Sequence, residues 1–123
     1  MTAITDSSLD QALGYARAGC TVAWIDDARG VDDAVYHAWL TLRDDSDVSV
    51  LRANGREKIK AEGGGIVRFF RSSNALRGYS VDVVFASCKY RDEKSMMSIM
   101  PSIAASEVGR FYALCERIEQ VSG

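Results

Sequence analysis

Long apolar runs are absent from this sequence, and none approaches the roughly 20 residues that a membrane-spanning helix requires. The first residues, MTAITDSSLDQ, also lack the basic start and the apolar stretch of a secretory signal peptide. These two absences argue against membrane and secreted classes. We therefore expect a cytoplasmic protein with no membrane partner.

Cysteine is scarce, and its arrangement argues against both a disulfide framework and a metal site. The three residues Cys20, Cys88 and Cys115 are odd in number, widely spaced and embedded in apolar segments. No C-x-x-C pair occurs, although such pairs are typical of zinc and redox sites. We therefore expect reduced, buried thiols, with no metal and no cofactor.

Candidate catalytic groups are also few. The only histidine, His37, lies inside a predicted helix, which favours a structural or surface role. Asp26 and Asp27 follow one predicted strand and Ser87 and Cys88 follow another, and ligands often bind at strand ends. No partner motif accompanies these four residues. We expect no catalytic residue, and a residual enzyme site near them remains an alternative.

The chain does have enough apolar residues for one globular domain. Its 123 residues are 47% hydrophobic and 26% charged, which fits a single domain over residues 1–123. The net charge of −2 hides an uneven distribution: residues 26–47 contain seven aspartates and two arginines, and residues 52–77 contain seven basic residues and two glutamates. Such blocks are either solvated surface or docking faces for an oppositely charged partner or a second copy.

Apolar periodicity predicts helices that alternate with strands. The first predicted helix begins after an N-cap at Ser7 or Ser8 and ends at Gly19. The other two predicted helices span Val31–Arg43 and Glu93–Ala105. The predicted strands are Cys20–Ile25, Val48–Leu51, Glu57–Ala61, Ile66–Arg71, Val81–Phe85 and Phe111–Cys115.

This order predicts an α/β fold of three layers, in which helices cover both faces of a mainly parallel sheet. The neighbouring strands Glu57–Ala61 and Ile66–Arg71 predict an inserted β-hairpin, with Gly63–Gly65 at its tip. A hairpin turn is favoured over a phosphate cradle for these glycines, because no strand-then-helix context surrounds them.

Several short phrases also occur in a fixed order. They are Asn54-Gly55, Ile59, Gly65, Ile66–Phe69, Arg77-Gly78-Tyr79-Ser80 and Val81–Phe85. In this order and spacing the chain resembles the ATPase domain of phage terminase large subunits, the DNA-packaging motors with a P-loop NTPase fold. Ala12–Ile25 and Met100–Leu114 are similar to other helix–strand pairs of that domain. The resemblance implies a phage or prophage gene and a location in the host cytosol.

The departures from that family concern its catalytic parts. Its phosphate loop ends in Gly-Lys-Ser/Thr, but the corresponding segment here, Met1–Ser8, has neither glycine nor lysine. Its apolar strand ends in an Asp-Glu pair that holds magnesium and activates water, where this chain has Ala86 and Ser87. The resemblance therefore implies a degenerate ATPase that does not turn over ATP.

The leading hypothesis is a non-catalytic binding or regulatory protein that acts through protein–protein contacts. The expected partner-binding residues are Arg56, Lys58, Lys60, Arg68, Arg71 and Arg77. Loss of the phosphate-loop strand, which is central in the family's sheet, predicts exposed strand edges and hence a homodimer or a heteromeric complex. A short replacement strand at Met1–Thr5 is the alternative.

A second hypothesis is a nucleic-acid-binding accessory of a packaging or helicase-type machine. It would use the basic 52–77 segment, which includes Arg52 in addition to the six residues above. The negative overall charge and the lack of regular aromatic interleaving, apart from Phe69 and Phe70, argue against it.

Overall fold

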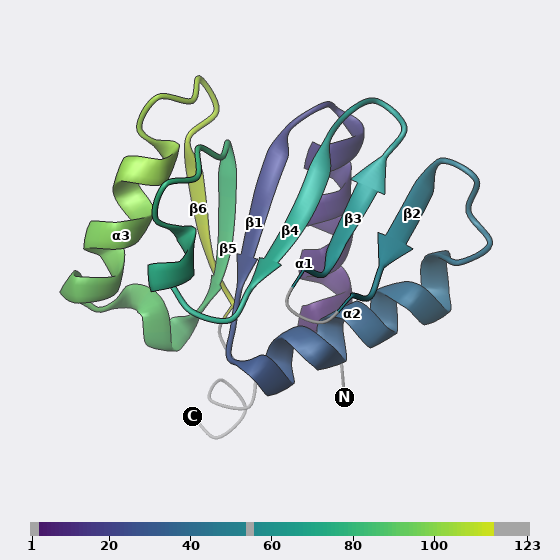
Figure 1. Cartoon of the computed structure of the whole chain (residues 1–123), viewed down its shortest axis with the longest axis horizontal. Helices are drawn as coiled ribbons and strands as arrows, with labels where there is room; N and C mark the ends of the chain where they lie inside the picture. The colour runs from purple at the N-terminus through teal and green to yellow at the C-terminus, as the bar shows by residue number, and fades with distance from the viewer. Residues whose placement is uncertain (1–2, 54–55, 115–123) are drawn as a thin grey trace.

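A computed structural model describes residues 3–53 and 56–114 of the chain. It is an α/β fold of three α-helices and one six-stranded sheet (Figure 1). The elements are α1 (Ala3–Arg17), β1 (Thr21–Ile25), α2 (Ala28–Leu42), β2 (Val48–Leu51), β3 (Lys58–Ala61), β4 (Ile66–Phe70), the 3₁₀ turn η1 (Asn74–Leu76), β5 (Val83–Ser87), the 3₁₀ turn η2 (Cys88–Arg91), α3 (Glu93–Ile103) and β6 (Arg110–Leu114).

The sheet is mixed, with the strand order β2-β3-β4-β1-β5-β6. Strands β4, β1, β5 and β6 pair in parallel, whereas β2, β3 and β4 pair antiparallel. The α/β class and the inserted β3–β4 hairpin are therefore confirmed. The sheet is continuous from β2 to β6, so no gap marks the place of a missing central strand.

Alternation along the strands divides the core between the two faces of the sheet. Val22 and Trp24 of β1 pack with α1 and α2 on one face, and Ala23 and Ile25 pack with η1 and α3 on the other. Figure 1 shows α1 behind the strands, whereas η1 and α3 lie beside β5 and β6. The indole of Trp24 stacks on Phe85 of β5, with 5.7 Å between ring centroids.

Several predicted boundaries shift, and two of these shifts have identifiable reasons. Helix α2 begins at Ala28 rather than Val31, because the Asp27 carboxylate caps it by accepting a hydrogen bond from the Gly30 N–H. Strand β5 begins at Val83 rather than Val81, because the Val81 N–H donates to the Ser102 carbonyl of α3. The Ala86 and Ser87 positions continue β5 by pairing with β6.

Both predictions for the amino-terminal segment are wrong where the structure describes it. Helix α1 begins at Ala3 rather than after Ser7 or Ser8. Residues 3–5 belong to α1, so they do not supply a replacement strand. The rest of that expectation, and the Asn54-Gly55 turn, lie outside the described residues.

The glycine run forms the hairpin turn, as expected. Gly64 has φ +97°, and a Cβ on Gly65 would collide with the Ala16 carbonyl of α1. The close approach of the hairpin to α1 therefore requires glycine at this position.

The cysteine expectation is wrong for one residue. Cys88 takes part in a disulfide, whereas Cys20 is a free, half-buried thiol. Burial raises the pKa of the Cys20 thiol, which keeps it protonated and unreactive. Cys115 lies outside the described residues.

None of the described helices is both long enough and apolar enough to cross a membrane.

Candidate functional site

Half of one sheet face carries no helix among the described elements. Helix α3 packs over β5 on that face, whereas β2, β3 and β4 are uncovered there in the view of Figure 1. We call this half the open sheet face. It is formed by Ser49, Leu51, Lys58, Lys60, Ile66 and Arg68.

Strand pairing brings three cations of the open sheet face together. Lys58 lies opposite Arg68 of β4, and Lys60 lies two residues along β3 on the same face. Directly opposed residues in an antiparallel pair have their Cβ atoms about 5 Å apart. Lys58, Lys60 and Arg68 therefore form one basic cluster.

The local sequence explains why these side chains face outward. Ile59 and Val67 are fully buried against the helices on the other face. Because successive strand residues point to opposite faces, burying these two apolar side chains places the three cations on the open sheet face.

The basic cluster is not neutralised from within the described part of the chain. None of Lys58, Lys60 and Arg68 forms an ion pair with any residue of 3–53 or 56–114. Lys60 is exposed, and the other two are half-buried. Their charge is therefore available to a partner.

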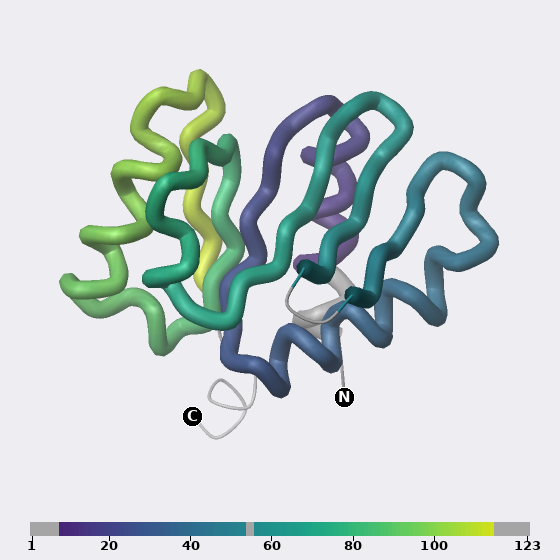
Figure 2. Tube along the Cα trace, in the orientation of Figure 1, coloured from purple at the N-terminus to yellow at the C-terminus, as the bar shows by residue number. Residues whose placement is uncertain are grey.

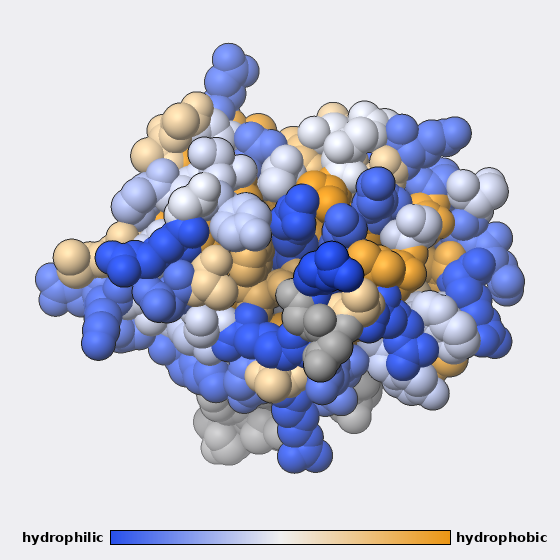
Figure 3. Space-filling view, viewed as in Figure 1, coloured by the Kyte–Doolittle hydropathy of each residue, from blue (hydrophilic) through white to orange (hydrophobic). Residues whose placement is uncertain are grey.

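Apolar groups border the cluster. Leu51 is 41% exposed and Tyr79 is 45% exposed. The Arg68 guanidinium lies over the Tyr79 ring, 5.8 Å from its centroid, and the same ring packs edge-on against Phe70. Figure 3 shows this face as hydrophilic side chains interspersed with hydrophobic patches over β2, β3 and β4. The surface therefore offers both charge and apolar contact area.

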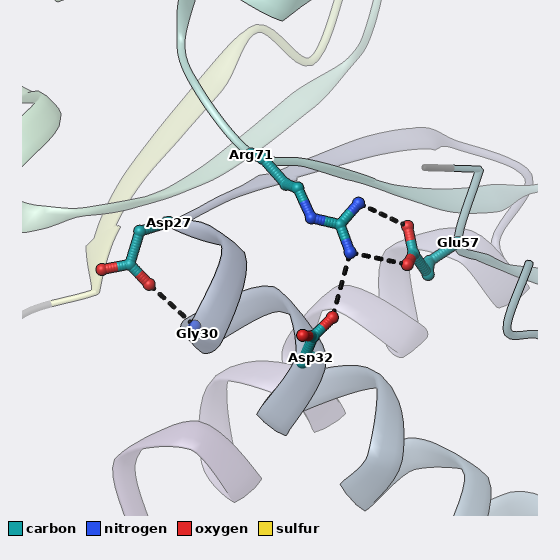
Figure 4. Close-up of polar contacts among 5 residues, drawn as sticks. All are labelled: Asp27, Gly30, Asp32, Glu57 and Arg71. Carbon is teal, nitrogen blue, oxygen red and sulfur yellow. Dashed lines mark hydrogen bonds and ion pairs between the residues drawn. The ribbon is translucent and has the colours of Figure 1, made fainter. Parts of the chain in front are cut away.

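Arg71 does not belong to the open sheet face. Its Nη1 and Nη2 donate to the two carboxylate oxygens of Glu57 at 3.1 and 2.8 Å, and Nη2 also donates to Asp32 at 3.0 Å (Figure 4). The Glu57 hydrogen bonds raise the pKa of Arg71. Because Glu57 is buried, Arg71 ties the segment before β3 to α2 and is not available for docking.

The other two expected docking residues lie at the periphery. Arg56 is exposed in the segment before β3, and Arg77 is exposed immediately after η1. The structure therefore brings together three of the six expected residues, with Arg77 near Tyr79 and Arg56 near the start of β3.

At the carboxyl ends of β1 and β5, where the alternative site was expected, the acidic side chains already accept hydrogen bonds from neighbouring groups of the chain. Asp26 accepts a hydrogen bond from the Asp27 N–H at 2.8 Å. Asp27 accepts one from the Gly30 N–H at 2.8 Å, as Figure 4 shows. The other Asp27 oxygen receives Lys89 Nζ at 3.0 Å. The Gly30 bond and then the Lys89 bond hold the pKa of Asp27 below its ordinary value.

This arrangement determines what the edge can bind. The N-terminus of a helix ordinarily attracts phosphate, but the N-terminus of α2 already carries the Asp26 and Asp27 carboxylates. Ser87 is half-buried, and Cys88 is in a disulfide, so its sulfur is not a thiolate nucleophile. The edge is therefore suited to stabilising α2 rather than to phosphate chemistry.

Sequence reasoning missed the apolar border of the open sheet face. Leu51 could have been found from period-two alternation, since Val48 and Val50 face the core beneath α1 and α2. Tyr79 had no such signal, because its position depends on where the segment after η1 folds back over β4.

The described part of the chain contains no group of three or more His, Cys, Asp or Glu residues that could hold a metal ion. No family model, curated protein or solved structure matches this chain. The resemblance to terminase ATPase domains therefore stays a prediction.

Proposed function

We propose that this protein is a non-catalytic binding protein that docks an acidic surface of a partner protein on the open sheet face. The observation that supports it is the cluster of Lys58, Lys60 and Arg68, which has no carboxylate partner among the described residues. Other cations of the chain, Arg17 and Arg71, do have such partners.

The composition of the surface supports a protein partner. Interfaces combine apolar contact area with polar groups at the rim, and Leu51 and Tyr79 supply exposed apolar area beside the cations. The cations would accelerate encounter with an acidic partner and fix its orientation.

The non-catalytic part of the proposal is supported by the carboxyl edge. A catalytic ATPase of the P-loop type would need a phosphate grip and acidic groups after β5. We infer instead a degenerate, three-layer P-loop-type fold of phage or prophage origin that lacks both. Ala86 is fully buried at the position of the first acidic residue, and two carboxylates occupy the N-terminus of α2. A phosphate at that N-terminus would meet negative charge.

The geometry favours a heteromeric complex over a two-fold dimer through the charged segments. A two-fold interface must contain both complementary surfaces in one patch. Here helix α2, the centre of the acidic segment 26–47, packs on one face of the sheet, and the basic cluster lies on the other.

A second candidate function is nucleic-acid binding by the same face. Stacking of the Arg68 guanidinium on the exposed Tyr79 ring favours it, since single-stranded nucleic acids bind where cations adjoin an aromatic ring.

The test compares two charge-reversal variants that change net charge equally. Lys58→Glu, Lys60→Glu and Arg68→Glu together alter the open sheet face, and Arg29→Glu, Arg91→Glu and Lys94→Glu together alter exposed cations elsewhere. Partners captured from the producing cell after nuclease treatment are quantified by mass spectrometry. We expect a partner captured by the wild type and the second variant but not by the first.

Equal capture by both variants would contradict the docking surface, and capture that nuclease abolishes would transfer the role to nucleic acid. Purified protein should also show no magnesium-dependent ATP hydrolysis. Turnover that disappears in Asp27→Asn would overturn the non-catalytic assignment.

A further inference from the structure

A cavity of about 390 Å³ opens beside Tyr79, between the segment that follows η1 and the exposed side of α3. Residues that line it include Arg77, Tyr79, Ser80, Met97, Ser98 and Pro101. Only Tyr79 and Arg77 of this lining border the proposed docking surface, and the α3 side of the cavity has no role in it.

The lining combines polar groups, namely Arg77 and the three serines Ser80, Ser98 and Ser102, with the apolar groups of Tyr79, Met97 and Pro101. Met97 is 71% exposed, and Pro101 is exposed beside it on α3. Methionine adapts its shape to a bound apolar group because its side chain is unbranched and polarisable. Arg77 contributes a guanidinium that has no ion-pair partner in residues 3–53 or 56–114. No carboxylate lines the cavity. It therefore suits a large, mainly apolar side chain that can also form a hydrogen bond, such as an indole, with a carboxylate nearby.

The cavity is continuous with the open sheet face through Tyr79. One ring contributes both to the lining of the cavity and to the contact with Arg68, whose guanidinium is 5.8 Å from the ring centroid. Elements η1 and α3 pack on the same face of the sheet as Phe70, which lies two residues along β4 from Arg68 of the open sheet face. A partner on the basic cluster therefore reaches the cavity by crossing a single side chain.

The chemistry of this extended surface favours a peptide over a nucleic acid. Single strands bind by stacking successive bases on several aromatic side chains. Tyr79 is the one exposed aromatic among the described residues that line the cavity or border the cluster, and its ring already contacts Arg68 and Phe70. A peptide needs one apolar anchor in a pocket and carboxylates for the flanking cations.

We propose that the partner binds through an acidic segment whose large apolar side chain enters the cavity between Tyr79 and α3, while one of its carboxylates pairs with Arg77. This inference rests on the proposed docking role of the open sheet face. It names the part of the partner that the surface recognises.

The test uses synthetic peptides as probes. A labelled 14-residue peptide of glutamate and glycine with one central tryptophan is compared with the same peptide carrying serine instead, and with a 14-nucleotide oligothymidine. Fluorescence anisotropy at low salt measures the affinity for the full chain. We expect the tryptophan peptide to bind roughly tenfold more tightly than the serine peptide, as for an interface anchor.

Protein variants assign the difference to the cavity. Met97→Gln should remove the advantage of the tryptophan peptide and leave the affinity for the serine peptide within about twofold, because it makes the side chain polar without changing the charge of the surface. Met97→Leu is the matched control and should keep the advantage. Both variants alter a side chain that is 71% exposed, and urea unfolding verifies that they fold.

The outcomes separate the two proposals. If both peptides bind equally and the Lys58, Lys60 and Arg68 charge reversals abolish binding, the docking face stands and the cavity assignment is wrong. If the oligothymidine binds and neither peptide does, both assignments are wrong. Failure of all three probes to bind would also overturn the inference.

Discussion

The open sheet face and the carboxyl edge of the sheet use basic residues in opposite ways. At the edge, Arg71 is held by Glu57 and Asp32, and Lys89 is held by Asp27. On the open face, Lys58 and its neighbours have no carboxylate partner within the described chain. The basic segment 52–77 therefore contains two kinds of cation: structural cations, which pair with carboxylates of the chain, and available cations, which do not. Their positions in the fold distinguish them.

The largest expected effect concerns the structural arginine. Arg71→Met removes two charge-assisted hydrogen bonds from Glu57, whose side chain is only 5% exposed. Removing one member of a buried ion pair commonly costs 3–5 kcal/mol, and Arg71 is 29% exposed. We therefore expect a loss of about 3 kcal/mol in the free energy of unfolding, measured by urea denaturation.

Arg68→Met is the matched control, since the same substitution is made on the same strand region. Its guanidinium forms a stacking contact with Tyr79 but no ion pair with a described residue. Exposed contacts of this kind contribute about 0.5–1 kcal/mol. Equal losses in the two variants would remove the distinction between structural and available cations.

The next effect tests the helix cap at the carboxyl edge. Asp27→Ala removes the acceptor of the Gly30 N–H at the start of α2 and the partner of Lys89. Loss of an N-cap side chain costs about 1 kcal/mol. Asp44→Ala, at an exposed aspartate that forms no ion pair with residues 3–53 or 56–114, should change the urea midpoint much less. Comparable midpoints for the two variants would contradict the cap.

The same carboxylate makes stability depend on pH. Hydrogen bonds from Gly30 and Lys89 lower the pKa of Asp27 below its usual 3.8 in the folded state. The stabilisation that the ionised Asp27 carboxylate gives the folded state is therefore present above pH 3.8, and it is lost as the pH falls through the pKa of the folded state. Urea midpoints measured from pH 6 to pH 2 should decline more steeply for the wild type than for Asp27→Asn. Parallel declines would contradict this assignment.

The sequence predicted those parts of the fold that depend on local pattern. Alternation at Lys58–Ala61 and the glycines at 63–65 were sufficient for the hairpin, and apolar periodicity was sufficient for the three helices. The start of α2 was missed because the residue types of Asp26 to Gly30 are also typical of a turn. Only the hydrogen bond from the Gly30 N–H to Asp27 shows that the helix begins at Ala28.

The candidate site was predicted less completely, because its composition depends on distant contacts. Arg71 has the same sequence context as a docking residue, and only the approach of Asp32 from α2, 39 positions away, reveals its structural role. Tyr79 reaches the site only because the segment after η1 folds back and places its ring against Arg68 and Phe70 of β4. Neither arrangement has a periodic signal in the sequence.

The smallest expected effect concerns self-association of the 13.5 kDa chain. Helix α2, the centre of the acidic segment 26–47, and the basic cluster lie on opposite faces of the sheet. A contact that joins the acidic surface of one copy to the basic cluster of another therefore leaves one unpaired surface of each kind, to which a further copy can bind. We therefore expect the average mass in sedimentation to rise gradually with concentration at low salt, without stopping at a dimer. It should return to the monomer at about 0.3 M salt, where charges separated by several ångströms are largely screened. Lys60→Glu should abolish the rise, and Lys94→Glu should retain it. A mass that stops at twice the monomer in both salts would contradict the head-to-tail contact and point instead to a two-fold interface at an edge strand, β2 or β6.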